Sequence, residues 1–363
     1  MFSKLPHFYM FLMIMFVGTL LSVSSVYWLG IWVGLEINLI GFLPLMVYKK
    51  SIMESESAVK YFVVQAIGSG LLLFGSLLSY NLSLSWDLIV MNWDFVSLDF
   101  FCLYYMSILI MGLCLKLGIF PFHFWLPSVM GGLSWFSCLL LATWQKIAPL
   151  FLMVFLIQNV VYYNLILIMC FMASGSSLIG GLGGYNQSQI RALLAYSSIS
   201  HLGWIFFSCI YSETVMVIYL AIYIMITFGL FLSLLHSNLF IMKVSKKMLD
   251  SMVSAKITMM VLFLTLGGLP PFLGFFSKWL VMYVSLTVET FSFSLFFLIL
   301  GNLISLSYYL SLSFNIYLSE LKKYQIGKIY NMGLNMYMWI FVIVVNVVSL
   351  MLIMKLNLFS VFL

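Results

Sequence analysis

Long apolar windows alternate with short polar connections along the whole chain. Windows of about 20 apolar residues, the length that crosses a bilayer as one helix, occur about eleven times. The pattern predicts an all-α polytopic membrane helix bundle of about 11 transmembrane helices, and we expect residues 1–363 to form a single membrane domain. The approximate windows are 7–25, 27–48, 58–80, 100–120, 133–157, 160–183, 191–211, 214–241, 256–288, 291–318 and 335–357.

Composition supports a membrane protein and excludes most soluble classes. Of the 363 residues, 64% are hydrophobic and 7% are charged, whereas soluble domains carry about 25% charge. The sequence contains no P-loop and no basic nucleic-acid patch, and its five cysteines form no C-x-x-C pair. We interpret the glycine run at 180–184 as a tight turn at a helix end, and the apolar start of the chain as a retained helix rather than a cleaved signal or presequence.

The basic residues predict the orientation. An odd number of spans puts the two termini on opposite sides, and twelve of the sixteen basic residues then fall on the N-terminal side. Only Lys355 falls on the other side. The positive-inside rule therefore assigns the N-terminus to the matrix or cytoplasm. The twelve are Lys4, Lys49, Lys50, Lys60, Arg191, Lys243, Lys246, Lys247, Lys256, Lys322, Lys323 and Lys328.

Four Glu or Lys residues lie away from the ends of the apolar windows: Glu36, Lys116, Lys146 and Lys278. Each costs about 2.5 to 3.5 kcal/mol at the bilayer centre, and such residues are a default sign of an ion or proton pathway. Two alternatives stay open at this point. The lysines could snorkel to an interface, and Glu36 could be a protonated, hydrogen-bonded structural acid. If Glu36 is ionised, Lys116 is the expected partner, in a charge pair that can form and separate.

Each of the three lysines lies beside a predicted helix interruption. Proline removes a backbone donor and clashes with the preceding turn, and the window 256–288 is too long for one straight span. Transporters use interrupted helices where ions pause near the midplane, so we expect a broken helix at each lysine. The associations are Lys116 with Gly118 and Pro121, Lys146 with Pro149, and Lys278 with Pro270, Pro271 and Gly274.

Two histidines are interpreted differently. His201 lies within the window 191–211, among serine hydroxyls that could hold water. Both a proton relay and a satisfied core histidine fit that pattern. His123 lies near the matrix-side end of its window, and we expect it to pack or to face the interface.

Five segments of the sequence closely resemble the antiporter-like membrane subunits of respiratory complex I, the NADH-ubiquinone oxidoreductase of mitochondria. They are WLGIWVGLEINLIGFLPL, LKLGIFPFHFWLPSVMGGLSW, TWQKIAPL, QIRALLAYSSISHLGW and GGLPPFLGFFSKW, and the resemblance covers most of residues 28–290. It implies an antiporter-like inverted repeat that lacks the first three helices. It also implies a multi-pass protein of the mitochondrial inner membrane, with its N-terminus in the matrix and its C-terminus on the intermembrane-space side.

The resemblance also implies roles for individual residues. Glu36 matches the family's helix glutamate, Lys116 its paired lysine on a broken helix, Lys146 the central lysine, and Lys278 the lysine after the second break. His201 matches a histidine on the hydrophilic axis, so these five residues are the expected proton-translocation sites. The chain departs from the family pattern at Ser128 and Gly131. Any role that an acidic residue has there in the family is therefore in doubt for this chain.

The implied activity is proton translocation coupled to oxidation of NADH by ubiquinone. NADH and ubiquinone are used by the complex, the redox centres lie on other subunits, and we expect no cofactor or metal to be bound by this chain. The expected partners are other complex I membrane subunits and lipids, with no nucleic acid. Two alternatives remain: a cation/proton antiporter subunit, and a structural membrane scaffold with no proton path.

Overall fold

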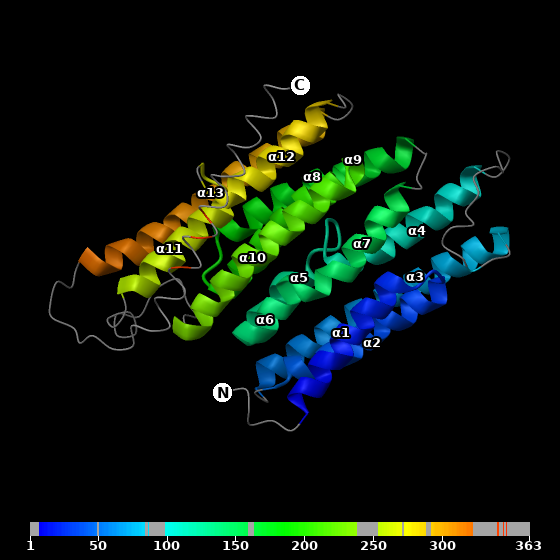
Figure 1. Cartoon of the computed structure of the whole chain (residues 1–363), viewed down its shortest axis with the longest axis horizontal. Coiled ribbons are helices and arrows are strands. Elements are labelled where there is room, and N and C mark those ends of the chain that lie inside the picture. Colours follow the sequence, from blue (N-terminus) through cyan, green and yellow to red (C-terminus); the bar gives the residue numbers. More distant parts are fainter. Residues whose placement is uncertain are drawn as a thin grey trace. The chain divides into compact units, whose positions relative to one another are not determined.

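The computed structural model describes residues 7–48, 51–83, 86, 99–158, 163–237, 253–270, 272–287, 292–321, 340, 344 and 346. Within these residues the chain forms thirteen α-helices (Figure 1). Their bounds are α1 Phe8–Ser24, α2 Trp28–Met46, α3 Ile52–Ser83, α4 Asp99–Leu117, α5 Trp125–Gly132, α6 Trp135–Ala142, α7 Trp144–Gln158, α8 Tyr163–Tyr185, α9 Ile190–Tyr211, α10 Glu213–Ser237, α11 Val253–Gly267, α12 Leu273–Thr287 and α13 Ser292–Leu321.

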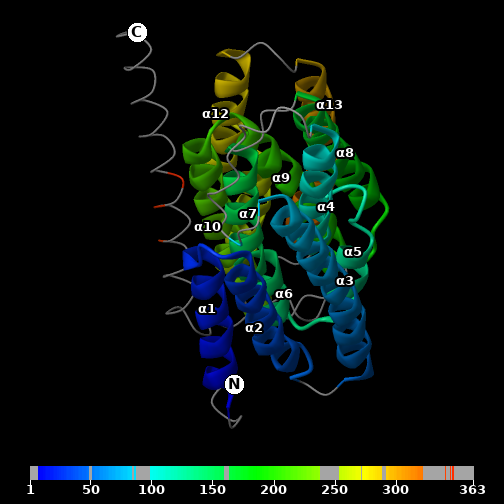
Figure 2. The same cartoon turned by 90° about the vertical axis from the view of Figure 1, so that its right-hand side faces the viewer.

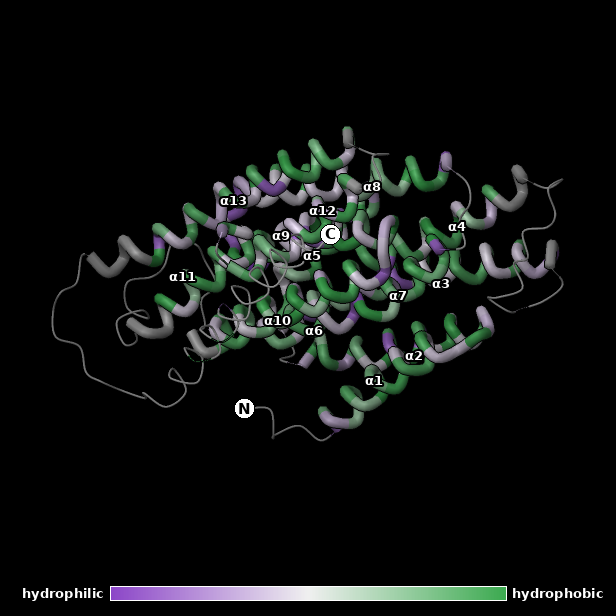
Figure 3. The backbone as a smooth tube through the Cα atoms, turned by 45° about the horizontal axis from the view of Figure 1, so that its top comes forward, coloured by the Kyte–Doolittle hydropathy of each residue, from purple (hydrophilic) through white to green (hydrophobic). Residues whose placement is uncertain are grey.

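The predicted all-α membrane bundle is confirmed. Seven helices of the described part are long and apolar enough to cross a bilayer, and four shorter apolar helices accompany them. Figure 3 shows hydrophobic residues along most of each helix, with isolated hydrophilic positions. The window 335–357 lies outside the described residues except for 340, 344 and 346, so the count of eleven spans stays a prediction. Most of the basic connections also lie outside them.

The chain divides into two compact units, Met1–Met172 and Ala173–Leu363. In the first unit, α2 packs on α1 and α3, α3 packs on α4 and α5, and α7 packs on α1, α4 and α6. In the second unit, α10 packs on α9, α11 and α12, and α13 packs on α9 and α11. The single membrane domain stays a prediction.

Glycines allow the closest helix approaches in the first unit. A Cβ atom on Gly18 would lie 2.5 Å from the backbone nitrogen of Asn38, so only glycine permits the contact of α1 with α2 (Figure 2). A Cβ on Gly112 would lie 3.1 Å from the Gly68 carbonyl oxygen, which brings α3 and α4 together. Membrane helices associate through such small residues because lipid tails supply no hydrophobic driving force.

The predicted turn at the glycine run 180–184 is wrong, because these residues continue α8. A helix satisfies its backbone polar groups within itself, which the bilayer interior requires. The glycines serve packing instead. A Cβ on Gly180 would lie 2.6 Å from the backbone nitrogen of Ser200 on α9, and one on Gly181 would lie 2.7 Å from the carbonyl oxygen of Gly301 on α13.

Candidate functional site

The first helix break follows Lys116 directly. Lys116 lies in the last turn of α4, and Gly118 ends the helix with a φ of 75°, a left-handed conformation that glycine adopts without strain. The break frees backbone carbonyls that need donors in the membrane. The Gln65 amide donates to the Lys116 carbonyl at 3.4 Å, and the Trp125 indole donates to the Leu115 carbonyl at 3.1 Å. The predicted interruption beside Lys116 is confirmed, and side chains satisfy its carbonyls.

Glu36 and Lys116 lie near each other without direct contact. Glu36 is on α2, and its charge acts on Lys116 and on Tyr61. Lys116 is only 7% exposed. Within the described residues the two charges form no direct ion pair, and the buried Oε1 of Glu36 has no hydrogen-bond partner. A buried carboxylate oxygen in this state gains free energy from water, from a proton or from approach of the ammonium. The predicted pair of Glu36 and Lys116 is therefore not in direct contact in the described part of the chain, and its formation and separation stay a prediction.

A pair of amides connects α2 to the start of α7. Asn38 donates from Nδ2 to Oε1 of Gln145 at 2.9 Å, and Gln145 donates from Nε2 to Oδ1 of Asn38 at 3.1 Å. The Tyr61 hydroxyl of α3 also donates to Gln145 Oε1, at 3.4 Å. These bonds fix the first turn of α7 at the residue next to Lys146.

Lys146 lies beside a break, but not the one predicted. Pro149 lies within α7, whereas the interruption is at Thr143, between α6 and α7. Pro149 falls in the second turn of α7, where it removes only the bond to the Gln145 carbonyl. Thr143 instead departs from ideal helix geometry, with φ −114° and ψ −70°, and its hydroxyl donates to the Leu139 carbonyl at 2.7 Å. Lys146 is 4% exposed and lies in the first turn of α7, the end whose dipole opposes a cation.

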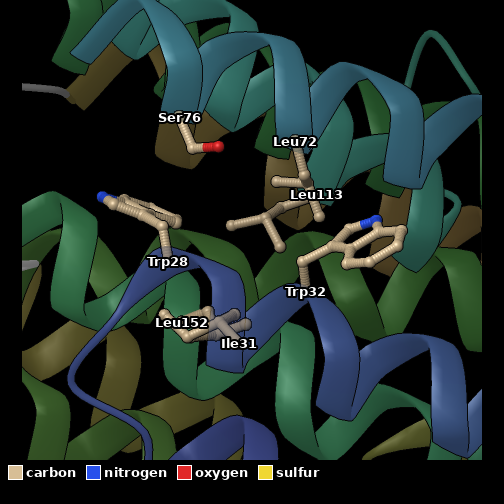
Figure 4. A pocket seen from close by; sticks show the side chains of 7 residues that line it. All are labelled: Trp28, Ile31, Trp32, Leu72, Ser76, Leu113 and Leu152. Atoms are coloured by element: carbon tan, nitrogen blue, oxygen red, sulfur yellow. The ribbon is translucent and has the colours of Figure 1, made fainter. Parts of the chain in front are cut away.

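A small cavity of about 10 Å³ lies beside the first half of α2. Figure 4 shows Trp28 and Trp32 beside Leu113, with the two indole nitrogens directed away from each other. Neither nitrogen has a hydrogen-bond partner among the described residues. A cavity this small and this apolar offers water too few partners, so it does not extend the polar site. Its lining is Trp28, Ile31, Trp32, Leu72, Ser76, Leu113 and Leu152.

The second unit holds Lys278 at the other predicted break. α11 ends at Gly267, Gly268 takes a φ of 77°, and α12 begins at Leu273. The Lys278 ammonium reaches back to the end of α11 and donates to the carbonyls of Gly267 at 3.2 Å and Leu266 at 3.5 Å. These are the negative end of the helix dipole and the carbonyls that the break leaves free. The interruption expected before Lys278 is therefore present, and its free carbonyls bind the ammonium.

The third acceptor of the same ammonium is the side-chain oxygen Oδ1 of Asn302 on α13. Lys278 is 3% exposed, and an ammonium has three donors. Each donor thus has one oxygen acceptor, two from the backbone and one from an amide. This arrangement lets a charged lysine remain buried without an opposite charge.

His201 lies on α9 and is 5% exposed. Its Nδ1 lies 3.1 Å from the Tyr219 hydroxyl of α10, and Tyr219 also interacts with Ser277, the residue before Lys278. The neighbouring serine hydroxyls, expected to hold water, donate instead to carbonyls three residues earlier in α9. In the first unit, His123 is buried and its ring packs on Phe120 and Phe124.

Sequence reasoning missed Asn302, Tyr219 and the Asn38–Gln145 pair. Asn302 carried a signal, since an asparagine within the apolar window 291–318 has to find a partner. Tyr219 carried none, because tyrosine is frequent in this chain and in membrane helices generally. In the part of the chain that the structure describes, no group of three His, Cys, Asp or Glu residues could hold a metal ion.

Apolar membrane helices, interrupted beside buried lysines, define the class of antiporter-like transport subunits. Residues 25–305 match the family model described as NADH:quinone oxidoreductase/Mrp antiporter, transmembrane region. The chain belongs to this family, and within it to the NADH-ubiquinone oxidoreductase chain 2 proteins. It is 41% identical to the chain 2 protein of Anopheles gambiae over 322 residues, 86% of each chain. It is 36% identical to that of Lumbricus terrestris, over 81% of this chain and 82% of the relative. The predicted resemblance is confirmed.

Solved structures support the fold alone. A chain of respiratory complex I from Thermus thermophilus with bound aureothin superposes with a TM-score of 0.81 at 22% identity, covering 96% of this chain and 79% of that chain. A chain of the archaeal membrane-bound sulfane sulfur reductase gives a TM-score of 0.82 at 16% identity, covering 99% and 76%.

Proposed function

We propose that this chain is the membrane subunit of respiratory complex I that couples electron transfer from NADH to ubiquinone to proton translocation. It is a multi-pass subunit of the mitochondrial inner membrane, and the N-terminus lies in the matrix by the distribution of its basic residues. Electron transfer takes place on other subunits, and this chain carries protons. The observation that supports this function best is the set of hydrogen bonds at Lys278, where the free carbonyls of a broken helix bind a membrane-buried ammonium.

In the first unit, Glu36 and Lys116 act as a pair whose separation changes how firmly Lys116 holds its proton. The unpartnered oxygen of Glu36 and the absence of a direct contact within the described residues suit this role. Burial leaves such charges weakly screened, so a small movement of either group has a large electrostatic effect. Lys146 is the next proton site of this unit.

In the second unit, His201 relays protons and Lys278 is the terminal site. The contact of His201 with Tyr219, and of Tyr219 with Ser277, supports the relay. An imidazole that accepts on one nitrogen and donates from the other can pass a proton without moving its ring far.

The test replaces Lys146 with methionine, which keeps the length of the side chain and removes its charge. The matched control is Lys60→Met, because Lys60 is 48% exposed and pairs with Glu56 on the same helix. We expect Lys146→Met to lower the number of protons translocated per NADH in the assembled complex, and Lys60→Met to leave it unchanged. An assembled Lys146→Met complex with the normal ratio would remove Lys146 from the path.

The same experiment separates the two alternative functions. A scaffold predicts loss of assembly with an unchanged proton ratio in the complex that survives. A cation antiporter predicts proton movement that depends on sodium. Our proposal predicts normal assembly, a lowered ratio and no sodium dependence.

A further inference from the structure

We infer that Asn302 is a positioning residue of the Lys278 site, and that its side-chain amide serves both protonation states of the lysine. This inference rests on the proposed role of Lys278 in proton translocation. When Lys278 is charged, Oδ1 of Asn302 accepts a hydrogen bond from the ammonium. When Lys278 is neutral, rotation of the amide presents Nδ2–H to the lone pair of the amine.

The contacts of Lys278 support the role of Asn302 as a hydrogen-bond acceptor for the charged lysine. Its three acceptors are the carbonyls of Leu266 and Gly267 and the side chain of Asn302. The two carbonyls belong to the backbone at the end of α11, and they can only accept. Asn302 is the one member of the set that carries both an acceptor and donors.

The neutral amine of Lys278 needs Asn302 as a hydrogen-bond donor. Loss of a proton leaves a lone pair on Nζ, and a buried lone pair needs a donor. Among the three partners only Asn302 can supply one, and rotation about its terminal torsion is sufficient because this torsion is broad and roughly two-fold. The amide can therefore follow the proton without any movement of the helices.

An amide also suits this position better than a carboxylate. Lys278 has no ion-pair partner among the described side chains. A carboxylate at 302 would form a charge-assisted bond, roughly twice as strong as a neutral one, and would hold the proton on the lysine. The buried titratable side chains that the structure describes on the helices packed around α12 and α13 are His201 and Cys209 of α9, Tyr219 and Tyr223 of α10, and Tyr308 and Tyr309 of α13.

The test compares Asn302→Leu, Asn302→Asp and Lys278→Met in the assembled complex in its native membrane. Leucine keeps the branched shape of the side chain and removes all hydrogen bonding, whereas aspartate keeps the shape and adds a charge. The measurement is the rate of proton translocation against pH, with the amount of assembled complex as a separate readout. Ser307→Ala on the exposed side of α13 is the control variant.

We expect the pH of half-maximal translocation to fall with Asn302→Leu, because the lost bond to the ammonium is charge-assisted and roughly twice as strong as the lost bond to the neutral amine. With Asn302→Asp this pH should rise, because the added negative charge favours the ammonium. Each shift should be about one pH unit, a tenfold change in proton affinity. In a Lys278→Met background neither Asn302 variant should change the profile further. The Ser307→Ala profile should match the unsubstituted complex.

Two results distinguish failure of the inference about Asn302 from failure of the proposed role of Lys278. If Lys278→Met lowers translocation while both Asn302 profiles stay at the normal pH, the inference about Asn302 is overturned and the proposed function stands. If Lys278→Met leaves translocation unchanged, the proposed role of Lys278 fails and the inference fails with it.

Discussion

Gly268→Ala tests the link between the helix break and the buried lysine. Gly268 has a φ of 77°, and an alanine in this left-handed conformation costs about 1 to 2 kcal/mol. Its Cβ would also lie 2.9 Å from Nζ and 3.2 Å from Cδ of Lys278. Non-bonded heavy atoms rest at about 3.5 to 4.0 Å, so the ammonium would have to move by about 0.6 Å or more.

That displacement weakens the bonds of the ammonium to the end of α11. The bond to the Gly267 carbonyl is already 3.2 Å long, and a hydrogen bond to a charged group contributes about 1.5 to 3 kcal/mol. Loss of one such bond changes the proton affinity by about tenfold or more, because about 1.4 kcal/mol is a factor of ten. We therefore expect Gly268→Ala to reduce the proton translocation rate of the assembled complex by about tenfold.

Two other glycines give matched controls. Gly118→Ala carries the same backbone cost, with φ 75°, but the atoms nearest to its Cβ belong to Leu126 and Trp125 and to no lysine. Gly70→Ala meets nothing within 4 Å. Gly118→Ala should lower thermal stability through the shared backbone cost while keeping more of the proton translocation than Gly268→Ala. Equal translocation in the Gly268→Ala and Gly70→Ala complexes would refute the reasoning.

Two further predictions concern packing in the first unit. Asn38→Leu leaves the half-buried amide of Gln145 without its two reciprocal bonds and should cost about 1 to 3 kcal/mol, seen as a lower Tm of the purified complex. Adding Gln145→Leu should restore most of that loss, and a Tm that falls further would argue against the amide pair. Gly18→Ala places a Cβ 2.5 Å from the Asn38 nitrogen and should destabilise the complex by about 1 to 3 kcal/mol. An unchanged Tm would contradict the close contact of α1 with α2.

The buried charges and two of the three breaks could be predicted from the sequence for a simple physical reason. A charge inside an apolar window is costly, so Glu36, Lys116, Lys146 and Lys278 stand out without any structure. Glycine beside proline ends a helix, and the breaks after Lys116 and before Lys278 follow from that.

The rest depended on packing between helices. The break near Lys146 falls at Thr143 and not at Pro149. A proline early in a helix removes few backbone hydrogen bonds and does not end the helix. The glycine run 180–184 is part of α8 and not the predicted turn. Its glycines are explained by close contacts with α9 and α13, which lie far away in the sequence. Asn302 and Tyr219 face Lys278 and His201 from other helices, and periodicity within one window does not predict such pairings.

Counting the protons translocated per NADH oxidised in intact complexes decides whether the lysines buried in the membrane carry protons. Lys116→Met, Lys146→Met and Lys278→Met should be measured separately, each beside Lys60→Met. We predict a lowered ratio for each buried lysine and the normal ratio for Lys60→Met. Fully assembled complexes in which all three buried substitutions keep the normal ratio would contradict the account.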